Sequence, residues 1–206
     1  MLILASGSQS RKNLLNNAHI DFIQISSDFD ESSITNNNIK DLALSLSENK
    51  ANSTLSKIKS IEFQNKSDEG SHQLIGCDSI FEFKGKSFGK PLNKKDAFNR
   101  WKEMSSRHGY LHTGHTLLFY GYKNNEPTLI SKTKEVITTK IYFSKLTFEE
   151  IQKYVDTLEP LSCAGGFALE GRGGKLIERI EGCYSNVMGL SLPWLKKELL
   201  KKGILL

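Results

Sequence analysis

The chain has 206 residues, of which 38% are hydrophobic and 25% charged, and its isoelectric point is near 9.0. This length fits a single domain with a sizeable core. The lysines lie scattered in short pairs, without the clustered cations and stacking aromatics of a nucleic-acid surface, so we expect no nucleic-acid partner. The first apolar run is too short for a signal peptide or a membrane span, and the three cysteines lack CxxC spacing. We therefore expect a cytoplasmic protein without membrane contact.

The first half of the chain alternates short strands with helices. Residues 2–5 form a continuously apolar strand, after which Ser8 is placed to cap a helix. A strand over 22–25 leads into an acidic stretch, and apolar spacing predicts a long amphipathic helix over 39–58. A polar turn over 66–70 precedes a strand over 73–83, which we expect to be broken at Gly76-Cys77-Asp78-Ser79.

The second half adds two long strands to this alternation. Strand alternating with helix early, followed by a long hairpin, predicts an α/β protein with a mixed central sheet and flanking helices. In chain order, the expected elements are a hairpin-like turn at Gly85, a helix capped by Asn93, strands over 111–122 and 133–143, a turn near 124–127, a helix from 147–150, glycine-rich turns over 163–174 and a helix after Pro193.

The end of the first strand could bind an anion. Hydroxyl groups of Ser6, Ser8 and Ser10 lie in this turn, and Arg11 follows them at once. The free N–H groups and positive dipole end of a helix N-terminus attract anions, and the guanidinium fork of arginine suits phosphate oxygens. The turn is either a phosphate-binding site or an ordinary capped helix with a surface arginine.

Three further stretches carry side chains suited to chemistry on phosphates. Asp78 lies between apolar neighbours in a strand, so it is either at an exposed edge or serves as a general base or metal ligand. The acidic residues 28–31 either attract a hard cation or form a solvated loop. Lys90, held between Gly89 and Pro91, is either a fixed charge for phosphate or a turn lysine facing solvent.

Two tempting motifs do not fit their usual functions. Gly166 and Gly171 have the spacing of a Walker loop, but Arg172-Gly173 follows in place of Lys-Ser/Thr, which leaves Glu170 and Arg172 as candidate polar contacts. His108, His112 and His115 have helical spacing. Their segment contains glycines and continues into a β-branched, aromatic strand, which disfavours a zinc site.

Taken in order, these stretches resemble the Maf family of septum-formation-protein-like nucleoside triphosphate pyrophosphatases, in a cyanobacterial-type variant. The resemblance extends from Leu2 to about Leu199. The motifs that carry it are LASGSQSR (Leu4 to Arg11), SDFDE (Ser27 to Glu31), Lys50-Ala51, GCDS (Gly76 to Ser79), Gly89-Lys90-Pro91 and the run from Glu159 to Pro193.

The resemblance implies a fold and an activity. The fold is that of the inosine triphosphatases, an elongated two-lobed body in which residues 1–206 form one domain around a central cleft. The activity is hydrolysis of a nucleoside triphosphate to the monophosphate and pyrophosphate with a divalent cation, Mg²⁺ or Mn²⁺, which could remove non-canonical nucleotides. Homodimers are common among relatives. The alternative is a nucleotide-binding regulator of septum formation with little turnover.

The resemblance also implies roles for individual residues. Asp78 is the proton acceptor and, with Glu31, a metal ligand. The residues implied for the phosphates are Ser6, Ser8, Ser10, Arg11, Lys50 and Lys90.

Three positions depart from the family pattern. Ser10 stands where the family has a second arginine. Ser79 and Glu170, implied in base choice, replace the Thr and Gln of members that prefer dTTP and UTP. Glutamate at the second position resembles the branch that acts on modified guanosine nucleotides such as 7-methyl-GTP.

Overall fold

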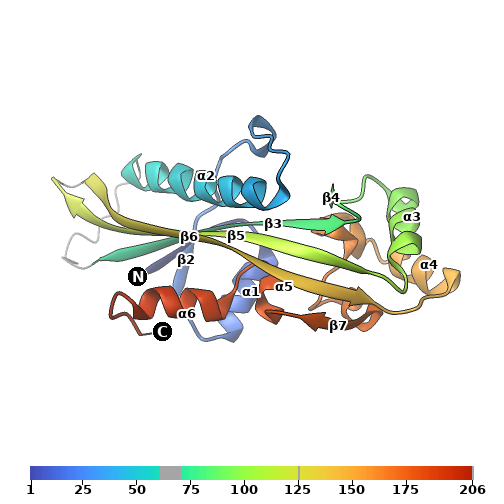
Figure 1. Ribbon diagram of the computed structural model, residues 1–206. Coiled ribbons are helices and arrows are strands. Elements are labelled where there is room, and N and C mark those ends of the chain that lie inside the picture. The colour runs from blue at the N-terminus through green and yellow to red at the C-terminus, as the bar shows by residue number, and fades with distance from the viewer. Residues whose placement is uncertain (61–70, 125, 206) are drawn as a thin grey trace. The chain divides into compact units, whose positions relative to one another are not determined.

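The computed structural model describes residues 1–60, 71–124 and 126–205, so the polar turn expected over 66–70 lies outside the described residues. Within these residues, a seven-stranded mixed sheet has the order β2-β1-β3-β5-β6-β7, with β4 paired to β3 (Figure 1). Helices flank the sheet, which confirms the predicted α/β class. The strands are β1 (Leu2–Ala5), β2 (Phe22–Gln24), β3 (His72–Phe83), β4 (Lys86–Phe88), β5 (His108–Lys123), β6 (Glu126–Phe143) and β7 (Ile177–Glu181).

The chain divides into two compact units, and three strands run from one into the other. Unit 1 comprises Met1–Asp78, Gly114–Val136 and Leu192–Leu206, and unit 2 comprises Ser79–Thr113 and Ile137–Ser191. The expected single domain around a cleft stays a prediction. The helical elements are α1 (Gln9–Asn17), α2 (Ile39–Ser60), α3 (Lys94–Met104), α4 (Phe148–Asp156), α5 (Tyr184–Val187), α6 (Leu192–Leu200) and the 3₁₀ turns η1 (Glu31–Ser33), η2 (Glu159–Ser162), η3 (Ala164–Gly166) and η4 (Arg172–Leu176).

Unit 1 is built on parallel strands covered by helices on both faces. β1 pairs with β2 and β3, with Leu2 opposite Phe22 on one side and Gln73 on the other. α2 covers one face of the sheet, and α1 and α6 lie on the other (Figure 1). Strands covered on both faces are apolar throughout, which explains the uninterrupted run of β1. The core beneath α2 comprises Ile3, Ala5, Ala51, Leu55, Ile58, Leu74, Leu118 and Tyr120.

The break expected in the third strand is wrong. β3 runs without interruption through Gly76, Cys77 and Asp78. The glycine serves helix packing instead, because a β-carbon at Gly76 would lie 2.4 Å from the carbonyl oxygen of Ser47 in α2. Since β3 lies between β1 and β5 in the sheet, Asp78 is not on an edge strand. Gly76 therefore lets α2 approach β3 closely, two residues before Asp78.

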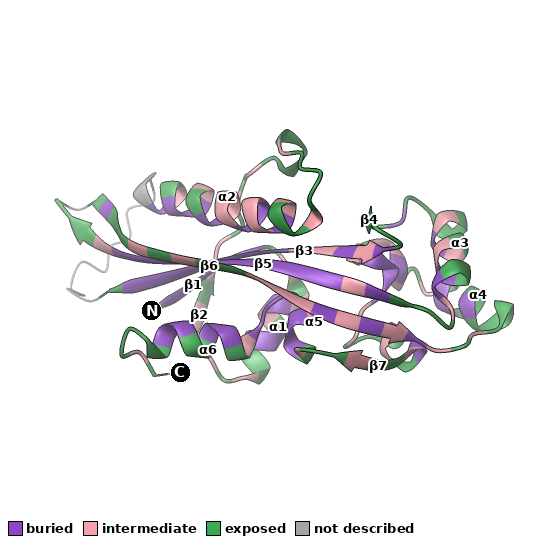
Figure 2. Cartoon of the chain, viewed as in Figure 1, coloured by how far each residue is buried: buried purple, intermediate pink, exposed green. Residues whose placement is uncertain are grey.

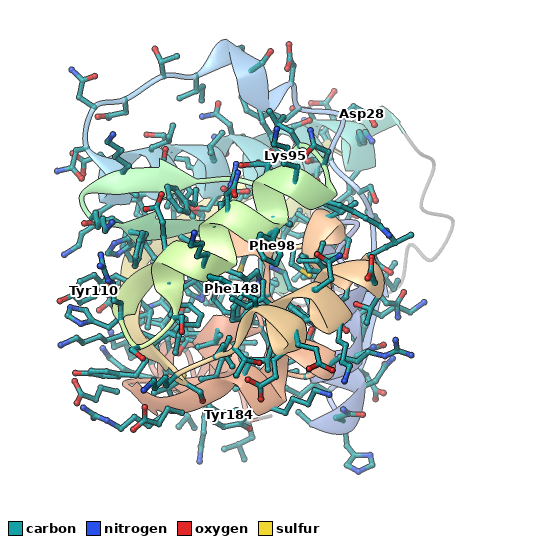
Figure 3. All side chains as sticks on the ribbon, turned by 90° about the vertical axis from the view of Figure 1, so that its right-hand side faces the viewer. Asp28, Lys95, Phe98, Tyr110, Phe148 and Tyr184 are labelled. Carbon is teal, nitrogen blue, oxygen red and sulfur yellow. The ribbon has the colours of Figure 1, made fainter. Side chains whose placement is uncertain are left out.

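Unit 2 packs α3 and α4 over an aromatic core. Trp101 meets Phe143 and Tyr154 edge to face, with ring centroids 5.4 and 5.1 Å apart. At the rim, Phe98 of α3 and Phe148 of α4 lie side by side (Figure 3), with centroids 6.2 Å apart. This aromatic core comprises the buried residues Phe81, Phe83, Ala97, Trp101, Met104, Leu111, Ile141, Phe143, Ile151, Tyr154, Val155, Phe167 and Leu176.

The predicted helix starts are confirmed where a polar side chain caps the backbone. Ser8 accepts from the backbone N–H of Arg11 and Asn93 from that of Asp96. Thr147 and Glu150 form a full capping box at α4. Burial is nearly continuous along β3 and β5, whereas buried and exposed residues intermingle along the helices (Figure 2). None of the described helices is long and apolar enough to span a bilayer.

Candidate active site

The turn between β1 and α1 holds Arg11 inside unit 1. Arg11 is only 7% exposed, and its Nη1 donates to Ser6 Oγ at 3.0 Å. The same Ser6 Oγ accepts from the backbone N–H of Ser8 at 3.2 Å, and the Ser6 carbonyl accepts from Gln24 Nε2 at 2.8 Å. The alternative of a surface arginine is therefore wrong. A guanidinium fixed by a turn presents its charge in a defined direction.

The other two serines of this turn lie in the first turn of α1. Ser8 is the N-cap, and its Oγ accepts from the Arg11 N–H at 3.4 Å. Ser10, which stands at the position of a family arginine, is half-buried, as is Lys12. The structure thus brings Ser6, Ser8 and Arg11 into one hydrogen-bonded turn.

Asp78 forms a buried ion pair with α2. It is 8% exposed, and its Oδ1 lies 2.5 Å from the ammonium nitrogen of Lys50. The close approach at Gly76 explains the pair, since Lys50 precedes Ala51, which contacts that glycine position. Burial raises the pKa of Asp78 above its ordinary value of 3.8, against the positive charges of Lys50 and Arg11. Asp78 is thus a partnered buried carboxylate, and Arg11 lies near enough to act on it.

Glu31 reaches the same lysine from the acidic stretch. Its Oε1 lies 2.8 Å from Lys50 Nζ, while 58% of the Glu31 side chain is exposed. The stretch itself is folded, because Asp30 caps η1 through the backbone N–H of Ser32. Asp28 pairs with Lys57 of α2 at 2.5 Å. The acidic side chains remain solvent-exposed, and Asp28 and Glu31 are also tied to α2 by its lysines, so both alternatives for this stretch stay open.

The oxygens of Glu31 and Asp78 form a small, hard donor set. Both side chains converge on one cation, the Lys50 ammonium. In the part of the chain that the structure describes, no three His, Cys, Asp or Glu residues group closely enough to hold a metal by themselves. The neighbouring Cys77 is no nucleophile, because burial raises its pKa to about 12. Two carboxylates suit a cation that takes its other ligands from phosphate and water.

In unit 2, Lys90 is exposed on a loop whose flanks are fixed. Arg100 of α3 donates to the Gly89 carbonyl at 2.8 Å. Pro91 is buried, and a β-carbon at Gly166 would lie 3.1 Å from its ring. The lysine therefore stands between two anchored neighbours.

The turn that carries Glu170 is organised by another carboxylate, Glu159. Glu159 accepts from the backbone N–H groups of Arg172 at 2.9 Å and Gly173 at 2.8 Å, and from Tyr154 Oη at 2.8 Å. At Gly171 there is no room for a side chain, because a β-carbon would lie 2.7 Å from Glu159 Oε2. Glu170 itself is exposed. Glu159 thus fixes the backbone that presents Glu170.

Lys90 and Glu170 belong to the same neighbourhood of unit 2. Burial raises the pKa of the Cys163 thiol, and the charges of Glu170 and Lys90 both act on that thiol. Ser79 is placed separately by a chain of hydroxyls. Its Oγ lies 3.0 Å from Thr113 Oγ1, which donates to the Asn186 carbonyl at 3.3 Å.

Comparison with known proteins gives consistent matches over the whole chain. A family model described as "Maf-like protein" matches residues 1–202. The chain belongs to this Maf-like family. Three relatives bear the name "Nucleoside triphosphate pyrophosphatase", from Prochlorococcus marinus strains MIT 9312, MIT 9215 and NATL1A. The MIT 9312 protein is 58% identical, over 99% of this chain and 100% of its own length. The MIT 9215 protein is 57% identical, over 97% of this chain and 98% of its own length. The NATL1A protein is 45% identical, over 99% of this chain and 97% of its own length.

The structure adds positioning residues of this Maf-like chain that sequence reasoning missed. Glu159 and Arg100 fix the two loops that present Glu170 and Lys90. The proline-containing run at Glu159 was recognised only as part of the family pattern. A carboxylate that caps a distant turn has no local signature, since its partners lie 13 and 14 residues along the chain.

Proposed function

We propose that this chain is a nucleoside triphosphate pyrophosphatase that hydrolyses its substrate to the monophosphate and pyrophosphate. The observation that carries the proposal is the contact of Lys50 with both Glu31 and Asp78, in the same unit as the buried Arg11. Cations to bind phosphate and carboxylates to hold a metal and accept a proton are what this hydrolysis needs. The relatives' names support the same activity.

The cationic groups would bind the triphosphate. We assign its oxygens to the Ser6–Ser10 turn, Arg11, Lys50 and Lys90. Arg11 is pre-positioned by Ser6, so little side-chain freedom is lost when a phosphate binds. Preorganised donors aimed at developing negative charge supply most of the rate enhancement in phosphoryl transfer.

Glu31 and Asp78 fit a divalent cation, Mg²⁺ or Mn²⁺. Their oxygens already converge on one positive charge, and both are the hard donors that these ions prefer. When bound, the ion would offset negative charge on the triphosphate. We assign the proton of the attacking water to Asp78 Oδ2, because Oδ1 is the oxygen that lies 2.5 Å from Lys50 Nζ.

Base choice is assigned to Ser79 and Glu170. Glu170 is an exposed carboxylate on a rigid turn, which suits recognition of N–H groups or a cationic base. The proposal extends to a cytoplasmic protein, in keeping with three free cysteines. A homodimer is proposed from the resemblance, and light scattering in solution checks it.

The test is a panel of canonical and modified nucleoside triphosphates incubated with Mg²⁺ or Mn²⁺. We expect pyrophosphate and monophosphate in equal amounts from at least one nucleotide, and loss of release when EDTA removes the metal. Orthophosphate as the sole phosphate product would contradict the proposal. Tight nucleotide binding without any turnover would instead favour the alternative of a regulator of septum formation.

A further inference from the structure

Lys50 occupies an unusual position between the two carboxylates proposed as metal ligands. Its ammonium nitrogen lies 2.8 Å from Glu31 Oε1 and 2.5 Å from Asp78 Oδ1, and only 11% of its side chain is exposed. Each contact uses a carboxylate oxygen that a metal would need. In the nucleotide-free protein, one cation therefore already bridges this pair.

An ammonium group and a divalent cation cannot both lie between Glu31 and Asp78 without a large electrostatic cost. Both need the same oxygen lone pairs, and like charges repel strongly at ligand distances, most of all beside the buried Asp78. Lys50 is also the residue assigned to the phosphates. A triphosphate would offer its ammonium a new set of negative oxygens, at the moment when the metal needs the carboxylates.

The segment that carries Glu31 would allow a metal to replace Lys50 at this carboxylate. Glu31 is 58% exposed and lies on a short 3₁₀ turn, so it can follow a new cation without breaking a packed core. The same segment is held to α2 a second time, by the Asp28–Lys57 pair and by Lys57 Nζ donating to the Ser26 carbonyl at 2.7 Å. Release of Lys50 would therefore free the Glu31 carboxylate while the segment stays attached.

We propose that Lys50 acts as an exchangeable cation: in the nucleotide-free protein it holds Glu31 and Asp78 together, and it is transferred to the triphosphate when the metal binds these carboxylates. The inference rests on the proposed function for the identity of the metal ligands. Its consequence is that the metal alone binds weakly, whereas metal and triphosphate bind together. Lys50 is then a residue that sets binding order as well as one that contacts phosphate.

The experiment measures Mn²⁺ binding to the full chain without nucleotide, from the EPR signal of free Mn²⁺. We expect Lys50→Met to bind Mn²⁺ at least about tenfold more tightly than the wild-type chain, because a like charge has left the site. Lys50→Gln keeps an N–H donor for the buried Asp78, and provides the same test if Lys50→Met does not fold. It should show a similar gain.

Two matched variants locate the effect. Lys57→Met removes a lysine of the same helix that pairs with the same acidic segment, and it should bind Mn²⁺ as the wild-type chain does. Adding Glu31→Gln to Lys50→Gln should abolish the gain, because one of the two ligands is then lost. Unchanged or weaker Mn²⁺ affinity in every folded Lys50 variant overturns the inference, as does an equal gain in Lys57→Met.

Pyrophosphate release by the wild-type chain separates this inference from the proposed function. If the wild-type chain releases pyrophosphate but the Lys50 variants bind Mn²⁺ no more tightly, the proposed pyrophosphatase activity is supported and the proposed exchange of Lys50 is contradicted. A Mn²⁺ gain without turnover on any nucleotide would support the exchange and contradict the pyrophosphatase.

Discussion

The two units present their candidate functional residues in different ways. In unit 1 the charged side chains contact one another: Lys50 touches both Glu31 and Asp78, and the buried Arg11 acts on Asp78. In unit 2 the exposed Lys90 and Glu170 are presented by backbone that other side chains fix. Contacting charges tune one another and suit chemistry, whereas exposed groups on anchored loops suit recognition. Changes in unit 1 should therefore affect turnover, and changes in unit 2 should affect selection and stability.

The largest expected effect is that of Asp78→Asn. Loss of the proposed proton acceptor, which is also a proposed metal ligand, should lower kcat for pyrophosphate release by about two to four orders of magnitude. Asp156→Asn is the matched control, because Asp156 is also ion-paired, to Lys94 at 2.8 Å, but is 51% exposed and belongs to α4. The control should turn over as the wild-type chain does. A near-normal kcat in Asp78→Asn would contradict the expectation that changes in unit 1 affect turnover.

The next effect concerns the scaffold of unit 2. Glu159→Gln removes the charge that three donors share, which should cost about 2 kcal/mol of unfolding free energy. For a chain of this size that lowers Tm by roughly 4 to 8 °C in a calorimetric scan. Gln152, on the exposed side of α4, supplies a control through Gln152→Ala, which should shift Tm little. An unchanged Tm in Glu159→Gln would mean that this carboxylate does not organise the turn.

The comparison of the wild-type chain with Glu159→Gln also predicts how the difference in Tm depends on pH. Burial alone would raise the pKa of Glu159, but the N–H donors of Arg172 and Gly173, the Tyr154 hydroxyl and the charge of Arg172 together outweigh it and hold the pKa below its ordinary value of 4.5. A carboxylate whose pKa is lowered by folding stabilises the folded chain above its unfolded pKa and loses that contribution as the pH falls. The Tm difference between wild type and Glu159→Gln should therefore be constant above about pH 5 and narrow below 4.5. A gap that widens in acid would contradict this sign.

The smallest effect tests the departure at the opening turn. Ser10→Arg restores the second arginine of the family pattern on the first turn of α1. A partly exposed charge at the proposed phosphate site should lower KM roughly two- to fivefold and leave kcat unchanged. An unchanged KM would indicate that Lys12 already compensates for Ser10.

Local chemistry explains which parts of the fold were predictable. Ser8, Asn93 and Thr147 cap their helices through partners three residues away, so their sequence signatures suffice. The predicted break at Gly76 is wrong because this glycine allows the close packing of α2, which is distant in sequence, and does not interrupt the strand. β7 was missed altogether, since its short, charged pattern is stabilised by pairing with β6.

The candidate site was predictable as a set of residues and not as a set of contacts. Asp78 and Lys50 could be singled out from the chain and its resemblance, but their ion pair depends on the packing of α2 against β3. The same holds for Glu159, whose three donors come from two other segments. Long-range hydrogen bonds produce no periodic pattern in a sequence, so they could not be predicted from it.

The central claim, that the contacting charges of unit 1 carry the chemistry and Glu170 of unit 2 the choice of base, is tested most directly by one competition assay. Wild type, Asp78→Asn and Glu170→Gln are each given an equimolar mixture of nucleoside triphosphates with Mg²⁺, and the consumption of every nucleotide is followed chromatographically. We predict that Asp78→Asn slows all nucleotides together and keeps their ranking, whereas Glu170→Gln changes the ranking. A reordered ranking in Asp78→Asn together with unchanged relative rates in Glu170→Gln would contradict the account.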